Sequence, residues 1–213
     1  MKRHYIAAIV FAASMFGASG ACADATFDVS LDTSAISGTD GQVVFELIDG
    51  DGVVDNPLSL SSFDLGGGAI GAPADYLGSS GVSGDLSGTI AMDDSGGSAF
   101  FTQLVSFGTS LVFRLSTTNV PGGTPDAFSM ALYTPDFSAC YSDDQIGCTL
   151  LQVDLVGGTL SPASFALNGA SAQDLPAPVV TLASAPEPAS LLLLVAGLFG
   201  LASTRSSRLS RSR

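Results

Sequence analysis

The sequence has few of the residues on which most enzymes depend, and its middle has almost no positive charge. The 213-residue chain has no tryptophan, and its one histidine, His4, lies at the very start. Between Arg3 and Arg205 the only basic residue is Arg114. Residues 24–185 hold 19 carboxylates and one guanidinium, a balance of −18. This charge argues against nucleic acid or an anionic lipid surface as a partner. Without histidine or lysine in this part of the chain, most catalytic mechanisms lack a residue that they require.

The first 23 residues have the pattern of a secretory signal peptide. The charges of Lys2 and Arg3 are followed by an apolar stretch, residues 5–17, and by a small-x-small cleavage site that ends at Ala23. The apolar stretch is shorter than the roughly 20 residues that a membrane-spanning helix needs, so a cleaved leader is favoured. A lipid anchor at Cys22 is the weaker alternative, because no large aliphatic residue stands three positions before it.

The C-terminal end combines a short motif, an apolar run and a basic tail. Pro186, Glu187 and Pro188 precede residues 189–204, which carry no charge. The tail then holds four arginines, Arg205, Arg208, Arg211 and Arg213. At about 1.5 Å per residue the apolar run reaches roughly 24 Å as a helix, enough to cross a thin bilayer. The positive-inside rule places the arginines in the cytoplasm and the rest of the chain on the outer side.

The ordered set of signal peptide, Pro-Glu-Pro motif, apolar segment and terminal arginines resembles the PEP-CTERM sorting signal of Gram-negative bacteria that make exopolysaccharide. The resemblance implies that residues 184–213 are a sorting segment, which exosortase, a membrane-embedded transpeptidase resembling cysteine proteases, recognises and processes. It also implies export through the inner membrane by the secretion machinery and transient anchoring by the C-terminal helix. Release to the cell surface or the extracellular matrix would follow. An ordinary membrane anchor that is never cut is the alternative.

Residues 24–183 are expected to form one domain in which apolar residues alternate with small or acidic ones at a period of two. This alternation predicts five half-buried strands. Their inward residues are Phe27, Val29 and Leu31; Val43, Phe45 and Leu47; Leu111, Phe113 and Leu115; Phe128, Met130 and Leu132; and Leu151, Val153 and Leu155. A further strand over residues 58–65 changes phase, which predicts a bulge near Ser61 and Ser62. Strands are also expected at residues 86–92, 100–107 and 178–182.

Clusters rich in glycine and aspartate separate these strands and predict tight turns. Short strands with such turns are typical of an all-β protein, and we expect an antiparallel β-sandwich of the jelly-roll kind. A closed barrel is the alternative. Residues 60–68 and 118–129 also resemble recurring segments of a PEP-CTERM subgroup with no assigned activity, which supports the architecture and leaves the biochemistry open.

Two cysteines lie in a polar segment between predicted strands. In an exported chain, Cys140 and Cys148 are expected to form a disulfide rather than remain as free thiols. Loop closure by this bond would stabilise the fold by roughly 2–3 kcal/mol. A cysteine nucleophile would need a base, and no histidine remains once the leader is removed.

A loop rich in aspartate offers a candidate calcium site. Asp49, Asp51 and Asp55 match the third, fifth and ninth positions of an EF-hand-like loop. The first and twelfth positions would be Leu47 and Leu58, so the usual opening aspartate and closing glutamate are missing. A glycine-rich turn with solvated acids is therefore favoured over a calcium site, and no other cofactor is expected.

Other candidate chemistry is weaker. Arg114 should point away from the core and form ion pairs with nearby acids, although it could instead fork onto a ligand carboxylate. Hydrolysis by two carboxylates is open, but nothing singles out a pair among the acids of the domain. Stacking of sugars has little support, because few tyrosines occur and the phenylalanines mostly occupy inward positions.

These patterns together predict a non-enzymatic, exported protein that is structural or adhesive in the exopolysaccharide matrix. Its expected partners are exosortase, the secretion machinery, the inner membrane and exopolysaccharide. A calcium-dependent carbohydrate-binding module is the alternative, and a glycoside hydrolase that uses carboxylates alone is a remote one.

Overall fold

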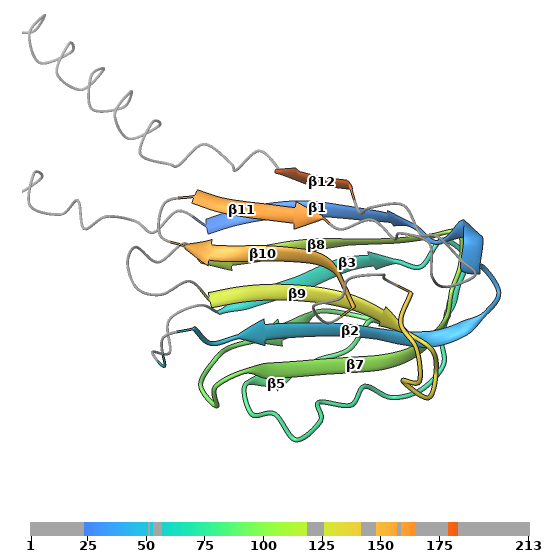
Figure 1. The fold of residues 1–213 in the computed structure, drawn as a ribbon, viewed down its shortest axis with the longest axis horizontal. Coiled ribbons are helices and arrows are strands. Elements are labelled where there is room, and N and C mark those ends of the chain that lie inside the picture. The colour runs from blue at the N-terminus through green and yellow to red at the C-terminus, as the bar shows by residue number, and fades with distance from the viewer. Residues whose placement is uncertain are drawn as a thin grey trace, which may run out of the picture. The chain divides into compact units, whose positions relative to one another are not determined.

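In the residues that it describes, the computed structural model of this chain is all-β, with two antiparallel sheets of six strands each (Figure 1). It describes residues 24–50, 52, 57–118, 126–141, 148–156, 159–164 and 179–182. The predicted leader, residues 1–23, and the predicted sorting segment, residues 184–213, lie outside the described residues. Across the described part of the chain, the helical structure is one 3-10 turn, η1 (Ser34–Ile36), and no helix could span a membrane.

The sheet that contains the first strand, named sheet A, has the order β12-β1-β8-β3-β6-β5. Its strands are β12 (Val179–Leu182), β1 (Asp24–Asp32), β8 (Ser110–Thr118), β3 (Leu58–Asp64), β6 (Ile90–Met92) and β5 (Val82–Ser83). Sheet B has the order β11-β10-β9-β2-β7-β4. Its strands are β11 (Thr159–Ser164), β10 (Thr149–Val156), β9 (Asp126–Tyr133), β2 (Asp40–Ile48), β7 (Ala99–Ser106) and β4 (Ala69–Ile70).

The predicted alternation of buried and exposed residues is confirmed in β1, β2, β8, β9 and β10. All 15 residues predicted to face inward on these strands are at most 4% exposed. Phe45 lies at the centre of the core they form. Its ring centroid is 5.3 Å from that of Phe113 on sheet A and 5.8 Å from that of Phe101 on sheet B. Side chains from both sheets therefore share one core, as in a β-sandwich.

The bulge predicted near Ser61 and Ser62 is confirmed. The register between β3 and β8 shifts between Ser61 and Asp64, and Ser62 has a φ of 58°. The extra residue changes the phase of the strand, so that Phe63 turns its ring inward. The centroid of that ring lies 5.9 Å from that of Phe113.

The strand predicted over residues 86–92 is wrong in its first half, because β6 begins only at Ile90. A turn precedes it, in which the carboxylate of Asp85 accepts a hydrogen bond from the backbone N–H of Ser87 at 2.8 Å. Such a local bond competes with strand pairing. Leu86 is nevertheless only 4% exposed, so its apolar side chain enters the core from a turn.

Candidate functional site

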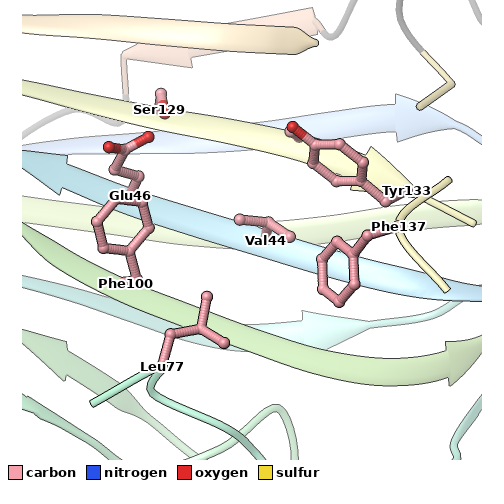
Figure 2. A pocket seen from close by; sticks show the side chains of 8 residues that line it. Val44, Glu46, Leu77, Phe100, Ser129, Tyr133 and Phe137 are labelled. Carbon is pink, nitrogen blue, oxygen red and sulfur yellow. The ribbon is translucent and has the colours of Figure 1, made fainter. Parts of the chain in front are cut away.

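A groove of about 250 Å³ lies on the face of sheet B that points away from the core (Figure 2). Three neighbouring strands of the sheet provide six of its lining residues: Val44 and Glu46 of β2, Phe100 of β7, and Ser129, Ala131 and Tyr133 of β9. Leu77 and Phe137, which lie in two loops, complete the lining. The groove therefore depends on segments far apart in the sequence.

Backbone pairing arranges the lining residues in rows across the sheet. Glu46 lies opposite both Phe100 of β7 and Ser129 of β9. Tyr133 pairs with β2 at Gln42, four residues away from Glu46. At about 3.3 Å per residue, the two rows are roughly 13 Å apart. The groove thus has a carboxylate near one end and a phenol near the other (Figure 2).

Two exposed apolar side chains form part of the groove wall. Leu77 is 56% exposed and Phe137 is 44% exposed. Their φ values are 50° and 57°, in the left-handed region that residues with a Cβ seldom adopt. Such a conformation costs on the order of 1–3 kcal/mol and persists only where the surroundings hold it. Strain of this kind concentrates at binding sites.

Hydrogen bonds hold the turn that carries Phe137. The backbone N–H of Phe137 donates to the carbonyl of Thr134 at 3.0 Å, and the N–H of Thr134 donates to the carbonyl of Ala139 at 2.9 Å. The carboxylate of Asp136 accepts hydrogen bonds from the hydroxyls of Thr134 at 2.8 Å and Ser138 at 2.7 Å. The ring of Phe137 is thereby held 5.5 Å from that of Tyr133, between centroids.

The predicted disulfide is confirmed and closes the segment that follows this turn. Cys140 is bonded to Cys148, with their Cα atoms 5.8 Å apart. Cys140 also pairs with Tyr133 in an isolated β-bridge. The next residue, Tyr141, is buried and packs its ring edge-on against Phe107. The turn is thus fixed on one side by the end of β9 and on the other by the disulfide and the core.

The carboxyl of Asp136 gives this turn a pH dependence that can be measured. Hydrogen bonds from the side chain and the backbone of Ser138, and from Thr134, lower the pKa of Asp136 from 3.8 to about 2. Because the folded pKa lies below the unfolded one, the contribution to stability is present above about pH 4 and is lost as the pH falls through about 2. We expect the carboxyl resonance of Asp136 to titrate near pH 2 by NMR.

The amide N–H resonance of Ser138 should follow the same titration in the wild-type protein and show no such step in Asp136→Asn. A midpoint for Asp136 near pH 4 would contradict the hydrogen bonding described for this turn.

Glu46 is the one carboxylate among the eight residues that line the groove. It is the one glutamate among the 19 acids of residues 24–185. Burial raises its pKa, and a hydrogen bond with Ser129 opposes that shift. Burial, with a smaller effect from the charge of Glu46, also raises the pKa of Tyr133. A carboxylate that has lost part of its hydration is well suited to accept a hydrogen bond from a ligand or to form an ion pair with a positively charged ligand.

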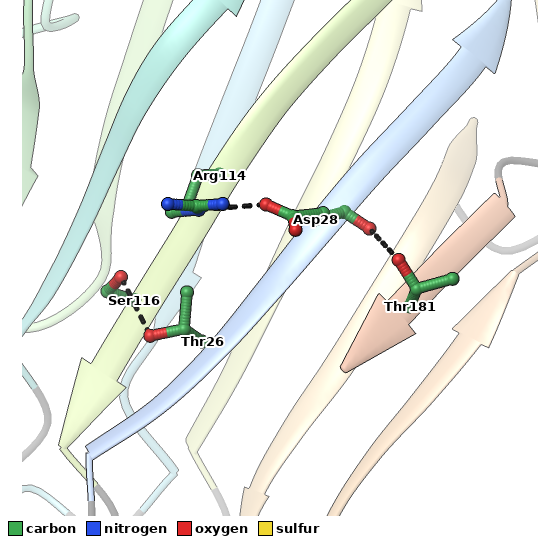
Figure 3. A network of polar contacts seen from close by, with 5 residues as sticks. All are labelled: Thr26, Asp28, Arg114, Ser116 and Thr181. Atoms are coloured by element: carbon green, nitrogen blue, oxygen red, sulfur yellow. Dashed lines mark hydrogen bonds and ion pairs between the residues drawn. The ribbon is translucent and has the colours of Figure 1, made fainter. Parts of the chain in front are cut away.

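The outer face of sheet A has a different character. Figure 3 shows an ion pair there between Arg114 and Asp28, with 2.8 Å between the guanidinium Nε and the carboxylate oxygen. Thr26 and Ser116 form a hydrogen bond beside it at 3.2 Å. The ion pair predicted for Arg114 is therefore confirmed. Both partners are about half exposed, at 48% and 45%, so solvent screens the pair and it contributes little to stability.

Of the three predicted calcium ligands, the structure describes one. Asp49 lies in a glycine-containing turn and accepts a hydrogen bond from the backbone N–H of Gly52 at 2.5 Å. Asp51 and Asp55 lie outside the described residues, so the calcium site stays a prediction. The buried carboxylate of Asp126 accepts a hydrogen bond from the N–H of Gly50 at 2.7 Å. Within the residues that the structure describes, no group of three or more His, Cys, Asp or Glu is placed to hold a metal ion.

The residues of the predicted sorting segment lie outside the described residues. They are Pro186, Glu187 and Pro188 of the motif and Arg205, Arg208, Arg211 and Arg213 of the tail.

Comparisons of the chain with models of protein families, with curated proteins and with solved structures find no match.

Proposed function

We propose that this is an exported, non-enzymatic protein of the cell surface or extracellular matrix, where it serves as a structural or adhesive component among exopolysaccharides. The predicted signal peptide and the PEP-CTERM-like segment, residues 184–213, support delivery by the secretion machinery and processing by exosortase. The observation that carries the proposal is the disulfide between Cys140 and Cys148. Disulfides form and persist in oxidising compartments outside the cytoplasm.

The fold proposed for the exported domain is a β-sandwich of the jelly-roll kind. The chain changes sheet after β1, β2, β3, β4, β6, β7, β8 and β11, and this repeated crossing supports the assignment. Residues 189–204 are proposed as the transmembrane helix that tethers the domain until it is released.

The groove on sheet B supports an adhesive role for the domain. It combines exposed apolar side chains, aromatic rings and one half-buried carboxylate on one face of a sheet. Concave sites of this composition are typical of ligand binding. Short polar side chains on the outer face of sheet A, among them Thr26, Asp28 and Ser116, suit a solvated surface.

The test is the intact mass of the protein recovered from a Gram-negative host with an active exosortase and from the same host lacking that enzyme. We expect the surface or secreted form to begin near Asp24 and to lack the chain that follows the Pro186 motif. Reduction should raise its mass by two hydrogen atoms, and a variant with Cys140→Ser and Cys148→Ser should show no such rise. Full-length chain in the cytoplasm, with no processed form outside, would refute the proposal.

A further inference from the structure

We propose that the groove on sheet B binds amino-sugar units of a glycan, with the sugar ammonium group paired to Glu46 and a sugar ring packed against Tyr133 and Phe137. This inference rests on the proposed function, because only an exported domain meets such glycans. It assigns a ligand class to a site that is independent of the predicted calcium loop.

The first argument is the charge that Glu46 needs. None of the eight residues that line the groove is basic. Arg114, the one basic residue of residues 24–185, lies on sheet A and is paired with Asp28 at 2.8 Å. The domain therefore cannot supply a lysine or arginine to the half-buried carboxylate. A cationic ligand can supply the missing positive charge. The net charge of −18 over residues 24–185 also attracts cations and repels acidic polysaccharides.

The second argument is the aromatic surface. The rings of Tyr133 and Phe137 are tilted by 50° to each other and lie in the wall of the groove. Phe100 lies next to Glu46 across the β2–β7 pair. Aromatic faces attract cations and also pack against the C–H groups of a sugar ring. Both parts of an amino sugar thus find a partner in the groove.

The third argument is the separation of polar and apolar groups. Figure 2 shows Ser129 and the polar ends of Glu46 and Tyr133 along one side, and Phe100, Leu77 and Phe137 along the other. A sugar ring likewise has hydroxyl groups at its edge and C–H groups on its faces. A lysine side chain would pair with Glu46 but has no ring face to pack against Tyr133 and Phe137. The length of the groove, roughly 13 Å between its end rows, suits two linked rings.

The experiment measures the affinity of the purified exported protein by calorimetry for a glucosamine tetramer, the matched N-acetylglucosamine tetramer, and trilysine. We expect the glucosamine tetramer to bind at least about tenfold more tightly than either of the others, because acetylation removes the charge and trilysine lacks the ring. Addition of a calcium chelator should leave its affinity unchanged.

Variants test whether Glu46 and the rings are responsible. Glu46→Gln should weaken glucosamine binding by about tenfold or more, and Phe137→Ala by about three- to tenfold. The matched control is Asp154→Asn, which removes the same charge from the outer face of sheet B but outside the groove, where Asp154 accepts a hydrogen bond from Gln152 at 2.7 Å. Its effect should be less than about twofold. Circular dichroism checks that each variant is folded.

Several results would overturn the inference. Equal affinity for the acetylated tetramer would remove the role of the ammonium group, and equal affinity for trilysine would remove the role of the sugar. Equal losses in Glu46→Gln and Asp154→Asn would show attraction by overall charge, and no binding would show that the groove has another role. None of these results changes the localisation and mass that test the proposed function.

Discussion

Replacement of Phe45 by alanine is expected to lower the free energy of unfolding by about 3–5 kcal/mol. Phe45 is fully buried on β2, and its ring lies within 6.1 Å, between centroids, of four other rings. Two of these rings, those of Phe63 and Phe113, come from sheet A. The substitution therefore leaves a cavity between the two sheets that neither sheet can close alone, because interiors relax only in part.

Urea unfolding followed by circular dichroism measures this loss, with the disulfide intact. The control is Phe137→Ala, which removes the same ring from a side chain that is 44% exposed and should cost less than about 1 kcal/mol. Equal losses in the two variants would show that Phe45 does not join the sheets as described.

Loss of the disulfide is expected to cost about 2–3 kcal/mol, because the bond closes a loop over a sequence separation of eight residues. Cys140 follows directly on the turn that carries Phe137, and Cys140 pairs with Tyr133. Without the bond, this turn loses one of its two supports. We therefore expect the double variant Cys140→Ser and Cys148→Ser to be less stable and also to bind glucosamine tetramer more weakly.

The stability of the double variant is compared with that of wild-type protein in urea, with and without reductant. Reductant should destabilise the wild type by the same amount and should leave the double variant unchanged. A wild-type protein that is indifferent to reduction would contradict a stabilising role for the bond.

The strands of the two sheets could be predicted because their burial follows a local pattern. In β2, for example, Val43, Phe45 and Leu47 alternate with residues that face outward, and each inward residue is fully buried. The bulge at Ser62 could be predicted for the same reason, since it shifts the phase of a pattern already visible. The turn at Asp85 departs from this pattern, because the apolar Leu86 favours a strand while the side chain of Asp85 forms a local hydrogen bond.

The groove could not be predicted, because it depends on pairing between distant strands. Nothing in the sequence around Glu46 indicates that Phe100 and Ser129 lie beside it in the sheet. Phe100 faces outward although most phenylalanines face inward, and Phe137 reaches the groove only through the turn that follows β9. The isolated glutamate among so many aspartates was the one local signal, and its meaning depends on neighbours that only the fold supplies.

The shortest strands among the described residues affect how two molecules of this protein can meet. One edge of sheet A is β5 and one edge of sheet B is β4, and each of these strands is two residues long. So short a strand exposes too few backbone donors and acceptors for a second molecule to continue the sheet. Pairing of a second molecule with the sheets at these two edges is therefore disfavoured.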